Sequence, residues 1–329
     1  MRIDLLLTSS IESTYENYMA KQIIFEFEKL GILYKKVLLF DGVLQDYLQL
    51  LEKDPPVTMI SFQSILPYQS PLGDLVGVSQ LMWVMNSLSE GAHFLTSEYG
   101  TLALPNPTNL PRTLYLPHGV KPLTSKKPYF DVIFLSPLVD TNCLRKRWIE
   151  VFSDPEIDRI NDVITQANLG YSIYELLKNS SDSLTLKYKI GIIEEYLKAK
   201  RAYRVITSCR DYPLDVFGDH IGRDWYLRLP NAEGIHLHPS LPYTAHFDLF
   251  TESKIVILDP LDTSWRLAAA AGGSLPLRAD LEDLHEQVLF YLADDQHRLE
   301  ALQDYQEEIQ NHTWETQVSQ LIDHIVKTS

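Results

Sequence analysis

The sequence predicts an α/β protein with two Rossmann-like domains. Short apolar segments alternate with stretches of helical spacing in two series, over 3–120 and 131–326, and the segment 121–128, rich in proline and lysine, separates them. Such alternation at short intervals is typical of βαβ units with a mostly parallel sheet. A chain of 329 residues also exceeds what one hydrophobic core usually serves.

The chain divides accordingly into three expected parts. The first domain spans 1–123, the second spans 124–310, and a last helix over 311–329 could pack back on the first domain. Apolar residues of the first domain recur at helical spacing from Met19 to Leu30, and Gly31 is placed to end that helix. Strands of this domain are expected at 3–7, 33–40, 57–62, 81–85, 93–96 and 112–120, with a second helix at 43–51.

The second domain repeats the pattern with longer helices. Because ligands of open α/β sheets bind at the carboxyl ends of the strands, two such domains facing each other would form a ligand cleft. Strands are expected at 131–135, 214–217, 236–241, 255–258 and 274–277. Helices are expected within 156–206 and at 243–251, 265–271, 281–292, 296–310 and 314–326.

The acidic composition argues against nucleic acid as a partner. The chain has 44 acidic and 29 basic residues, a net charge of −15, whereas phosphate contacts need clustered Lys and Arg. One local basic run remains, Arg145–Arg147. This run is either a solvated helix face or a contact to a donor phosphate or an acidic acceptor.

Nothing in the sequence indicates a membrane span or a secretory signal. No run approaches the roughly 18 apolar residues that a span needs. The short apolar run at 3–7 contains Asp4 and is followed by no small-residue cleavage site, so it is typical of a strand. Cys143 and Cys209 are far apart and are expected to be reduced structural thiols. We therefore expect a cytoplasmic protein.

Residue spacing predicts neither a metal site nor the commonest enzyme classes. His236 and His238 share one strand face, yet no cysteine or carboxylate pattern accompanies them, so we expect no metal and no cofactor. The sequence contains no Gly-x-Ser-x-Gly elbow, no Walker loop and no complete Gly-x-Gly-x-x-Gly fingerprint. This argues against the usual hydrolases, ATPases and dehydrogenases.

The most informative stretch is 249–277. A helix ending in Ser253-Lys254 leads into a buried strand, a polar loop, and a small-residue helix ended by Gly272-Gly273. The free N–H groups and the dipole at the start of that helix can hold a diphosphate, and its alanines allow a close approach to the sheet. The alternative is a small-residue helix that only packs on the sheet and ends in a glycine cap.

This stretch resembles the donor-binding half of GT-B glycosyltransferases, especially the bacterial group related to spore-maturation glycosyltransferases. The resemblance covers 112–329 by motif and 1–111 by pattern, and it implies a GT-B fold: two Rossmann-like domains with a cleft between them and C-terminal helices. The supporting motifs, in chain order, are the domain crossover at 116–120, the first donor-domain strand and loop at 131–136, the base and ribose strand at 216–219, the turn at 238–243 and the closing element at 312–315.

The resemblance implies a function as well as a fold. We expect a metal-independent, retaining transferase of the hexosyltransferase type, which moves a sugar from a nucleotide-sugar donor to a glycan, lipid or protein acceptor. Arg266 and Lys254 are the candidates for the donor phosphates, although Lys254 could be a solvated helix end and Arg266 a surface residue. The donor-binding residues expected on this basis are Ser136, Gly218, Asp219, Tyr243, Lys254, Ser264, Trp265 and Arg266.

Candidates on the acceptor side come from the first domain. His118, at the crossover, and Glu98, after the strand expected at 93–96, are the candidate catalytic residues. His118 could equally be a structural histidine, and Glu98 an exposed loop acid. Ser9 and Ser10 follow the first strand at its carboxyl end, where small residues let an acceptor or a sugar approach.

One position departs from the pattern. Many retaining GT-B enzymes carry a ribose-binding glutamate at the start of the Ala-rich helix, where this chain has Leu267. Either Arg266, Ser264 or Asp262 handles the donor differently, or donor binding is altered or lost. The alternatives to a transferase are therefore a catalytically inactive GT-B binding or regulatory protein and, as a third reading, a GT-B epimerase or phosphorylase.

Overall fold

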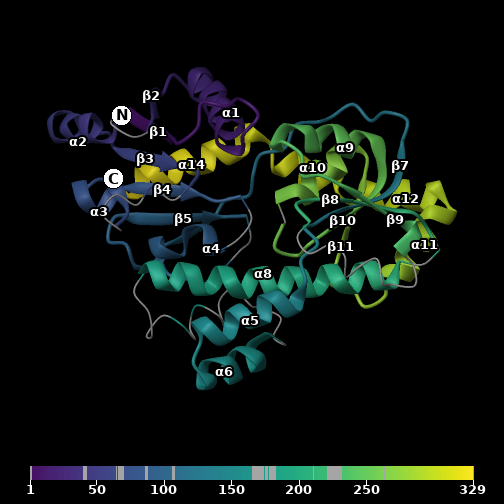
Figure 1. Ribbon diagram of the computed structural model, residues 1–329. Coiled ribbons are helices and arrows are strands. Elements are labelled where there is room, and N and C mark those ends of the chain that lie inside the picture. The colour runs from purple at the N-terminus through teal and green to yellow at the C-terminus, as the bar shows by residue number, and fades with distance from the viewer. Residues whose placement is uncertain are drawn as a thin grey trace. The chain divides into compact units, whose positions relative to one another are not determined.

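The computed structural model contains two compact units, each built around one sheet (Figure 1). Unit 1 comprises Met1–Gly119, Gln166–Gly191 and His312–Ser329, and unit 2 comprises Val120–Thr165 and Ile192–Asn311. The structure describes residues 2–39, 43–63, 65, 70–85, 88–105, 108–164, 174, 177, 183–209, 211–220, 232–262 and 264–328. In this part of the chain no helix combines the length and the apolarity that a bilayer crossing requires.

The sheet of unit 1 has six parallel strands in the order β2-β1-β3-β4-β5-β6. The strand order changes direction between β1 and β3, so the carboxyl ends of these two strands flank a topological switch point. β1 is buried from Ile3 to Leu7, as a strand covered on both faces of a parallel sheet must be. The strands are β1 Arg2–Leu7, β2 Leu33–Leu38, β3 Thr58–Ser61, β4 Gln80–Trp83, β5 Gly100–Leu104 and β6 Thr113–Tyr115.

The helices of unit 1 follow the connections between its strands. α1 ends at Gly31, as the sequence predicts, because glycine adopts the left-handed conformation (φ 66°) that closes the helix. The connections that lead from β2 to β5 contain the other helices. The helices are α1 Tyr15–Leu30, α2 Val43–Lys53, α3 Leu72–Val76, α4 Leu88–Gly91 and the 3-10 helix η2 Ala92–Thr96.

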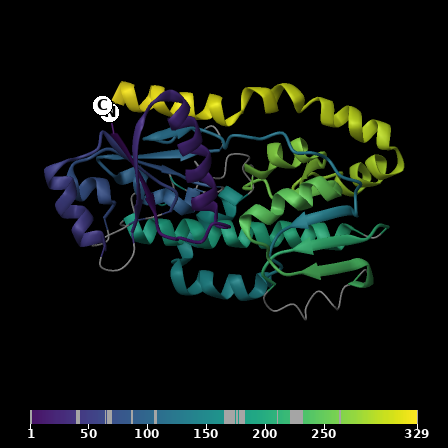
Figure 2. The same ribbon diagram turned by 90° about the horizontal axis from the view of Figure 1, so that it is seen from above.

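The C-terminal helix α14 (Trp314–Thr328) belongs to unit 1. Trp314, Val318, Leu321 and Ile325 recur at helical spacing and are buried in the same apolar cluster as the β1 residues. Figure 2 shows α14 running along the sheet of unit 1. The chain therefore completes the core of its first unit with its last residues.

The sheet of unit 2 has five parallel strands in the order β11-β10-β7-β8-β9. From β7 the chain moves outward through β8 to β9, then returns to β10 on the other side of β7. The switch point of this sheet therefore lies between β7 and β10, where ligands of such sheets bind. The strands are β7 Phe130–Leu135, β8 Leu214–Phe217, β9 Ile235–His238, β10 Ser253–Leu258 and β11 Leu275–Arg278.

Helix α8 (Ser183–Ser208) is the longest helix in the described part of the chain. The division between the units falls within it, after Gly191. Its second half buries Ala202, Val205 and Ile206 in the apolar core of unit 2. The other helices of unit 2 are α5 Thr141–Val151, α6 Asp154–Ile164, η4 Ala232–Gly234, η5 Tyr243–Ala245, α9 His246–Glu252, α10 Ser264–Gly272, α11 Leu284–Ala293, α12 Asp295–Gln303 and α13 Gln306–Asn311.

Several elements differ from those that the sequence predicts. The strand expected at 112–120 is only the three-residue β6, Thr113–Tyr115. The strand expected at 93–96 is the 3-10 helix η2, because a short buried apolar run has no periodicity that separates the two forms. The strand expected at 236–241 ends at His238, since Pro239 has no N–H for a ladder hydrogen bond. The helix expected at 296–310 divides into α12 and α13. Phe40, and residues 165–173, 175–176 and 178–182 of the expected helical stretch 156–206, lie outside the described residues.

Candidate functional site

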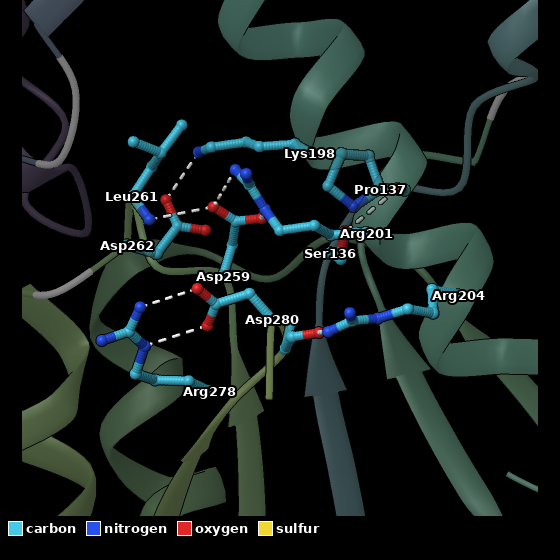
Figure 3. Close-up of polar contacts among 11 residues, drawn as sticks. Ser136, Pro137, Lys198, Arg201, Arg204, Asp259, Leu261, Asp262, Arg278 and Asp280 are labelled. Atoms are coloured by element: carbon cyan, nitrogen blue, oxygen red, sulfur yellow. Dashed lines mark hydrogen bonds and ion pairs between the residues drawn. The ribbon is translucent and has the colours of Figure 1, made fainter. Parts of the chain in front are cut away.

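The carboxyl edge of the unit 2 sheet carries a network of charged side chains (Figure 3). Ser136 follows β7 and Asp259 follows β10, so these two residues flank the switch point. Figure 3 shows Lys198, Arg201 and Arg204 projecting from α8 toward this edge. Their spacing of three residues places the three cations on one face of the helix.

Two of these cations are paired with carboxylates of the loop after β10. Arg201 donates from Nε and Nη2 to the two carboxylate oxygens of Asp259, over 2.6 and 2.8 Å. Lys198 donates from Nζ to Asp262 Oδ1 over 2.6 Å. The side chain of Asp259 is 3 % exposed and that of Arg201 14 %, whereas Lys198 is 25 % exposed. The pair nearest the sheet is therefore the more deeply buried one.

Two arginines complete the network near β11. Arg204 Nη2 donates to the backbone oxygens of Ala279 and Leu281, over 2.8 and 3.0 Å. Arg278, the last residue of β11, binds the carboxylate of Asp280 with two hydrogen bonds of 2.9 and 2.6 Å. Four cationic side chains thus meet at this edge.

The charges at this edge perturb one another. Burial acts to lower the pKa of Lys198, but the carboxylates of Asp262 and Asp259 outweigh it and raise that pKa above its ordinary value. Burial raises the pKa of Asp262, against the opposing attraction of Lys198. Burial likewise acts to raise the pKa of Asp280, but its hydrogen bonds with Arg278 leave that pKa below its ordinary value. Lys198 is therefore a cation at neutral pH.

The ends of β7 and β8 meet at Gly218. A Cβ at this position would lie 2.6 Å from Ser136 O and 2.8 Å from Pro137 N, so a glycine is required by the close approach of the two chains. Ser136 N donates to Phe217 O over 3.1 Å, and Asp219 accepts a hydrogen bond of 2.6 Å from Ser240 Oγ. The structure therefore brings together the expected donor-side residues Ser136, Gly218 and Asp219.

Lys254 lies at the wrong edge of the sheet for its expected role. It is the second residue of β10, at the amino end of the strand, and its Nζ pairs with Asp131 Oδ1 over 2.8 Å. Phosphates bind at the carboxyl ends of parallel strands, which lie at the opposite edge. Lys254 therefore belongs to an ion pair that joins the starts of β7 and β10.

Arg266 has a protein partner that accounts for its charge. Its guanidinium forms a bidentate pair with the carboxylate of Glu308, with Nη1 2.9 Å from Oε2, and lies 5.6 Å from the ring centre of Tyr305. The pairing explains a basic residue at the start of α10 without a ligand. Ser264, two residues earlier, is the first residue of α10. Leu267, the next residue, is buried in the apolar core.

Trp265 and Tyr243 pack in an aromatic cluster. The ring centre of Trp265 lies 4.6 Å from that of Tyr243 and 4.7 Å from that of His246, which is stacked on it. Trp265 is buried, and its ring also contacts Phe250. Its faces are covered by protein, so the expectation that Trp265 binds the donor is corrected: the residue joins α9 to α10.

The loop after β1 carries an internal carboxylate. Glu16 accepts hydrogen bonds from the backbone N–H groups of Thr8 and Ser9, over 2.8 and 3.1 Å, and one of 2.7 Å from Thr8 Oγ1. Glu16 thus already binds these two N–H groups of the loop at the switch point of unit 1. Ser9 and Ser10 do lie at the carboxyl edge of the sheet, and Ser10 is exposed.

His118 is a buried, neutral histidine of unit 1. Its Nε2 lies 3.0 Å from Tyr15 Oη and 3.1 Å from Val84 O, and because the carbonyl only accepts, Nε2 carries the proton. Nδ1 is buried without a hydrogen-bond partner in the described part of the chain. Burial lowers the pKa of His118 to about 4.

The expected position of Glu98 depended on a strand at 93–96, which is the 3-10 helix η2 in the structure. It precedes β5 and therefore lies at the amino end of that strand, away from the carboxyl edge. Its backbone N–H donates to Asp74 Oδ1 over 3.0 Å, and the residue is exposed. This placement contradicts a catalytic role at the carboxyl edge of the unit 1 sheet.

The remaining candidates are the histidines of β9, the two cysteines and the basic run on α5. Asp215, which the sequence pattern does not reveal, lies 2.7 Å from His238 Nε2 and 3.5 Å from His236 Nδ1, yet the described residues include no group of three arranged to hold a metal. Cys143 is exposed and Cys209 buried, and neither forms a disulfide. In the basic run Arg145–Arg147, the last residue pairs with Glu195 over 2.9 Å.

The sequence did contain a signal for the cations of α8. Basic residues at 198, 201 and 204 recur every three positions in a helical stretch, which places them on one face. The apolar residues of the same stretch are the stronger signal, because they define the face of the helix that packs in the core. Their position at a switch point becomes visible only once the sheet order is known.

Comparison with known proteins identifies the fold. No protein-family model matches the sequence, and no curated protein matches it. Among solved structures, the DNA-modifying enzyme β-glucosyltransferase, determined with and without its substrate uridine diphosphoglucose, matches with a TM-score of 0.50, covering 99 % of this chain and 100 % of that chain. The chain has the GT-B fold. At 11 % identity the likeness shows the fold and not the activity.

Two other structures match less well. MurG of Acinetobacter baumannii is 10 % identical, with a TM-score of 0.38 and 99 % of each chain covered. A mutant O-GlcNAc transferase of Thermobaculum terrenum is 11 % identical, with a TM-score of 0.45 and coverage of 98 % of this chain and 66 % of that chain.

Proposed function

We propose that this GT-B protein is a glycosyltransferase that moves a sugar from a nucleotide-sugar donor to an acceptor. The observation that carries the proposal is the position of Lys198 and Arg201 beside the switch point of the unit 2 sheet. Open α/β sheets bind their ligands at such points, and a diphosphate needs cationic or N–H donors. The uridine diphosphoglucose of the structurally similar β-glucosyltransferase is a ligand of this chemical class.

The chemistry requires little covalent machinery from the protein. As the bond between the sugar and the diphosphate breaks, negative charge develops on the leaving nucleoside diphosphate. Lys198 and Arg201 would stabilise that charge, without a metal ion, from a helix that is fixed in the core of unit 2. Gly218 and Asp219 would lie along the ribose and base, since they follow β8, the strand next to β7.

We further propose a hexose as the transferred sugar, with retention of configuration, and a glycan, lipid or protein acceptor. These details follow the resemblance of the motifs at 116–120, 216–219 and 312–315 to GT-B transferases. On the acceptor side, His118 is the candidate for contact with a substrate hydroxyl, as the resemblance implies.

One set of observations favours a second candidate, a GT-B protein that binds without catalysis. Lys198 and Arg201 both have carboxylate partners, and Arg266 is bound by Glu308. Leu267 is part of the apolar core, where it offers no hydrogen bond to a ribose. A binding or regulatory protein would retain the fold with such a site.

A thermal-shift screen tests the proposal. UDP, GDP, ADP and their sugars are added at millimolar concentration to the wild type, to Lys198→Met and to Lys200→Met, an exposed control on the same helix. Because a ligand that binds only the folded state raises the melting temperature, at least one nucleotide should raise that of the wild type and of Lys200→Met, and raise that of Lys198→Met less.

The outcomes separate the two candidates. A shift with no release of nucleoside diphosphate from the matching sugar would favour the binding protein. No shift from any nucleotide would contradict the transferase. An equal shift in Lys198→Met and the wild type would contradict the assigned site.

A further inference from the structure

The loop after β10 presents two carboxylates to two cations. Asp259 and Asp262 lie three residues apart, and the hydrogen bond from Asp262 N to Asp259 O, 2.8 Å, closes the turn between them. Opposite them on α8, Lys198 and Arg201 are also three residues apart. Figure 3 shows this two-to-two arrangement, in which each carboxylate faces one cation.

Carboxylates and phosphates compete for the same donors. Both present anionic oxygens at hydrogen-bond distance, and an arginine fork binds either of them in a bidentate manner. A diphosphate that reaches Lys198 and Arg201 would therefore meet carboxylates already in place. In the structure Lys198 and Arg201 are bound by carboxylates of the chain itself.

The two carboxylates are held differently. Asp259 is 3 % exposed and receives two hydrogen bonds from Arg201 and one of 2.9 Å from Leu261 N. Asp262 is 14 % exposed, and the structure gives its carboxylate a single hydrogen bond within the described residues, from Lys198. Asp262 is thus the carboxylate that can leave its partner with the smaller loss of contacts.

We propose that Asp262 is an internal competitor of the donor diphosphate at Lys198, displaced when the ligand binds, while Asp259 stays and positions Arg201. The inference rests on the proposed function, since it concerns the same site, and adds a regulation of that site. Asp262 holds Lys198 beside the switch point through the hydrogen bond of 2.6 Å. On binding, a phosphoryl oxygen takes over the Lys198 ammonium.

Displacement also changes the protonation of Asp262. The charged groups that face it are Lys198 and Arg201 on α8 and Asp259 after β10, and Glu194 on α8 faces Lys198. When the ligand takes Lys198, Asp262 loses its strongest favourable charge and remains near the negative Asp259. Burial and like charge both favour its neutral form, so binding raises the pKa of Asp262 and favours proton uptake there.

Titration calorimetry tests this inference with UDP, GDP, ADP and inorganic pyrophosphate as probes. The proteins are the wild type, Asp262→Asn, Asp262→Ser and the control Glu195→Gln, which alters an exposed carboxylate on α8. Titrations in two buffers of different ionisation enthalpy measure the protons taken up. The melting temperature of each variant verifies that it is folded.

The inference predicts that both Asp262 variants bind the best probe roughly tenfold more tightly than the wild type, because the competing ion pair is gone. On binding, the wild type and Glu195→Gln should take up more protons than the Asp262 variants, in which the probe's phosphates still titrate but residue 262 does not. If the wild type binds a probe and both Asp262 variants bind it equally or more weakly, the inference is overturned and the proposed function stands. Binding of no probe to any folded protein would overturn the proposed function itself.

Discussion

Arg201 on α8 donates two hydrogen bonds to the carboxylate of Asp259 at the carboxyl end of β10. The pair joins the long helix to the switch point of the unit 2 sheet, and both side chains are mostly buried. A bidentate arginine–carboxylate pair fixes orientation as well as distance. It therefore determines where Lys198, one turn earlier on the same face, presents its ammonium group.

Removing one partner of this pair should destabilise unit 2. Asp259→Ala leaves the buried guanidinium of Arg201 without a counter-charge, and we expect the free energy of unfolding to fall by about 3 kcal/mol. The exposed pair of Arg147 and Glu195 supplies the control, because Glu195→Ala should change that free energy by less than about 1 kcal/mol. Urea unfolding measures both, and a similar small loss in the two variants would contradict a structural role for the Arg201–Asp259 pair.

Gly218 is the second point at which the site depends on one residue. In Gly218→Ala the new Cβ would lie 2.6 Å from Ser136 O, so the ends of β7 and β8 must separate, and we expect a loss of about 1–3 kcal/mol in unfolding free energy. Gly234→Ala is the matched control, since among the described residues its Cβ would meet nothing closer than Tyr212 O at 3.9 Å. Equal melting temperatures for Gly218→Ala and Gly234→Ala would show that the two strand ends are not so closely packed.

His118 should make unit 1 sensitive to acid. Burial lowers its folded-state pKa to about 4, whereas the unfolded chain takes up the proton near pH 6.5. The stability that the neutral histidine provides is therefore fully present above the unfolded pKa and is lost as pH falls toward the folded one. Between pH 7 and pH 5 this single group should reduce the unfolding free energy by about 2 kcal/mol.

The matched variant for this test is His118→Gln, which cannot titrate. His93, whose pKa burial lowers to about 3, retains its own contribution in the variant, so the pH dependence should become shallower without disappearing. Urea unfolding at the two pH values measures the difference. An unchanged slope in His118→Gln would contradict a buried, neutral His118.

Much of the fold could be predicted from the sequence because apolar periodicity reports the local structure. β8 begins and ends at the expected residues, and Gly31 ends α1 where its position indicates. The strand expected at 93–96 is wrong because a run of four residues, three of them buried, is compatible with a strand and with a 3-10 turn. β5, which the pattern did not reveal, starts four residues later.

The candidate site was harder to predict, because it depends on contacts between distant residues. Arg266 resembles a phosphate ligand until Glu308, which lies 42 residues further along the chain, is seen to bind it. Lys198 and Arg201 have acidic partners about 60 residues away, and no local pattern connects them. By contrast, the close approach of Ser136 and Gly218 matches motifs that the sequence displays, since a glycine after a strand is itself a local signal.

The central claim is that the protein cleaves a nucleotide sugar and that Lys198 and its neighbours hold the diphosphate as it leaves. Its most direct test is the rate at which nucleoside diphosphate is released from a panel of UDP, GDP and ADP sugars, with water as the acceptor. We predict release from at least one donor, at equal rates in the wild type and in the exposed control Lys200→Met, and at a rate roughly a hundredfold lower in Lys198→Met, because a charge that stabilises the leaving group is lost. Release from no donor, or an unchanged rate in Lys198→Met, would contradict the claim.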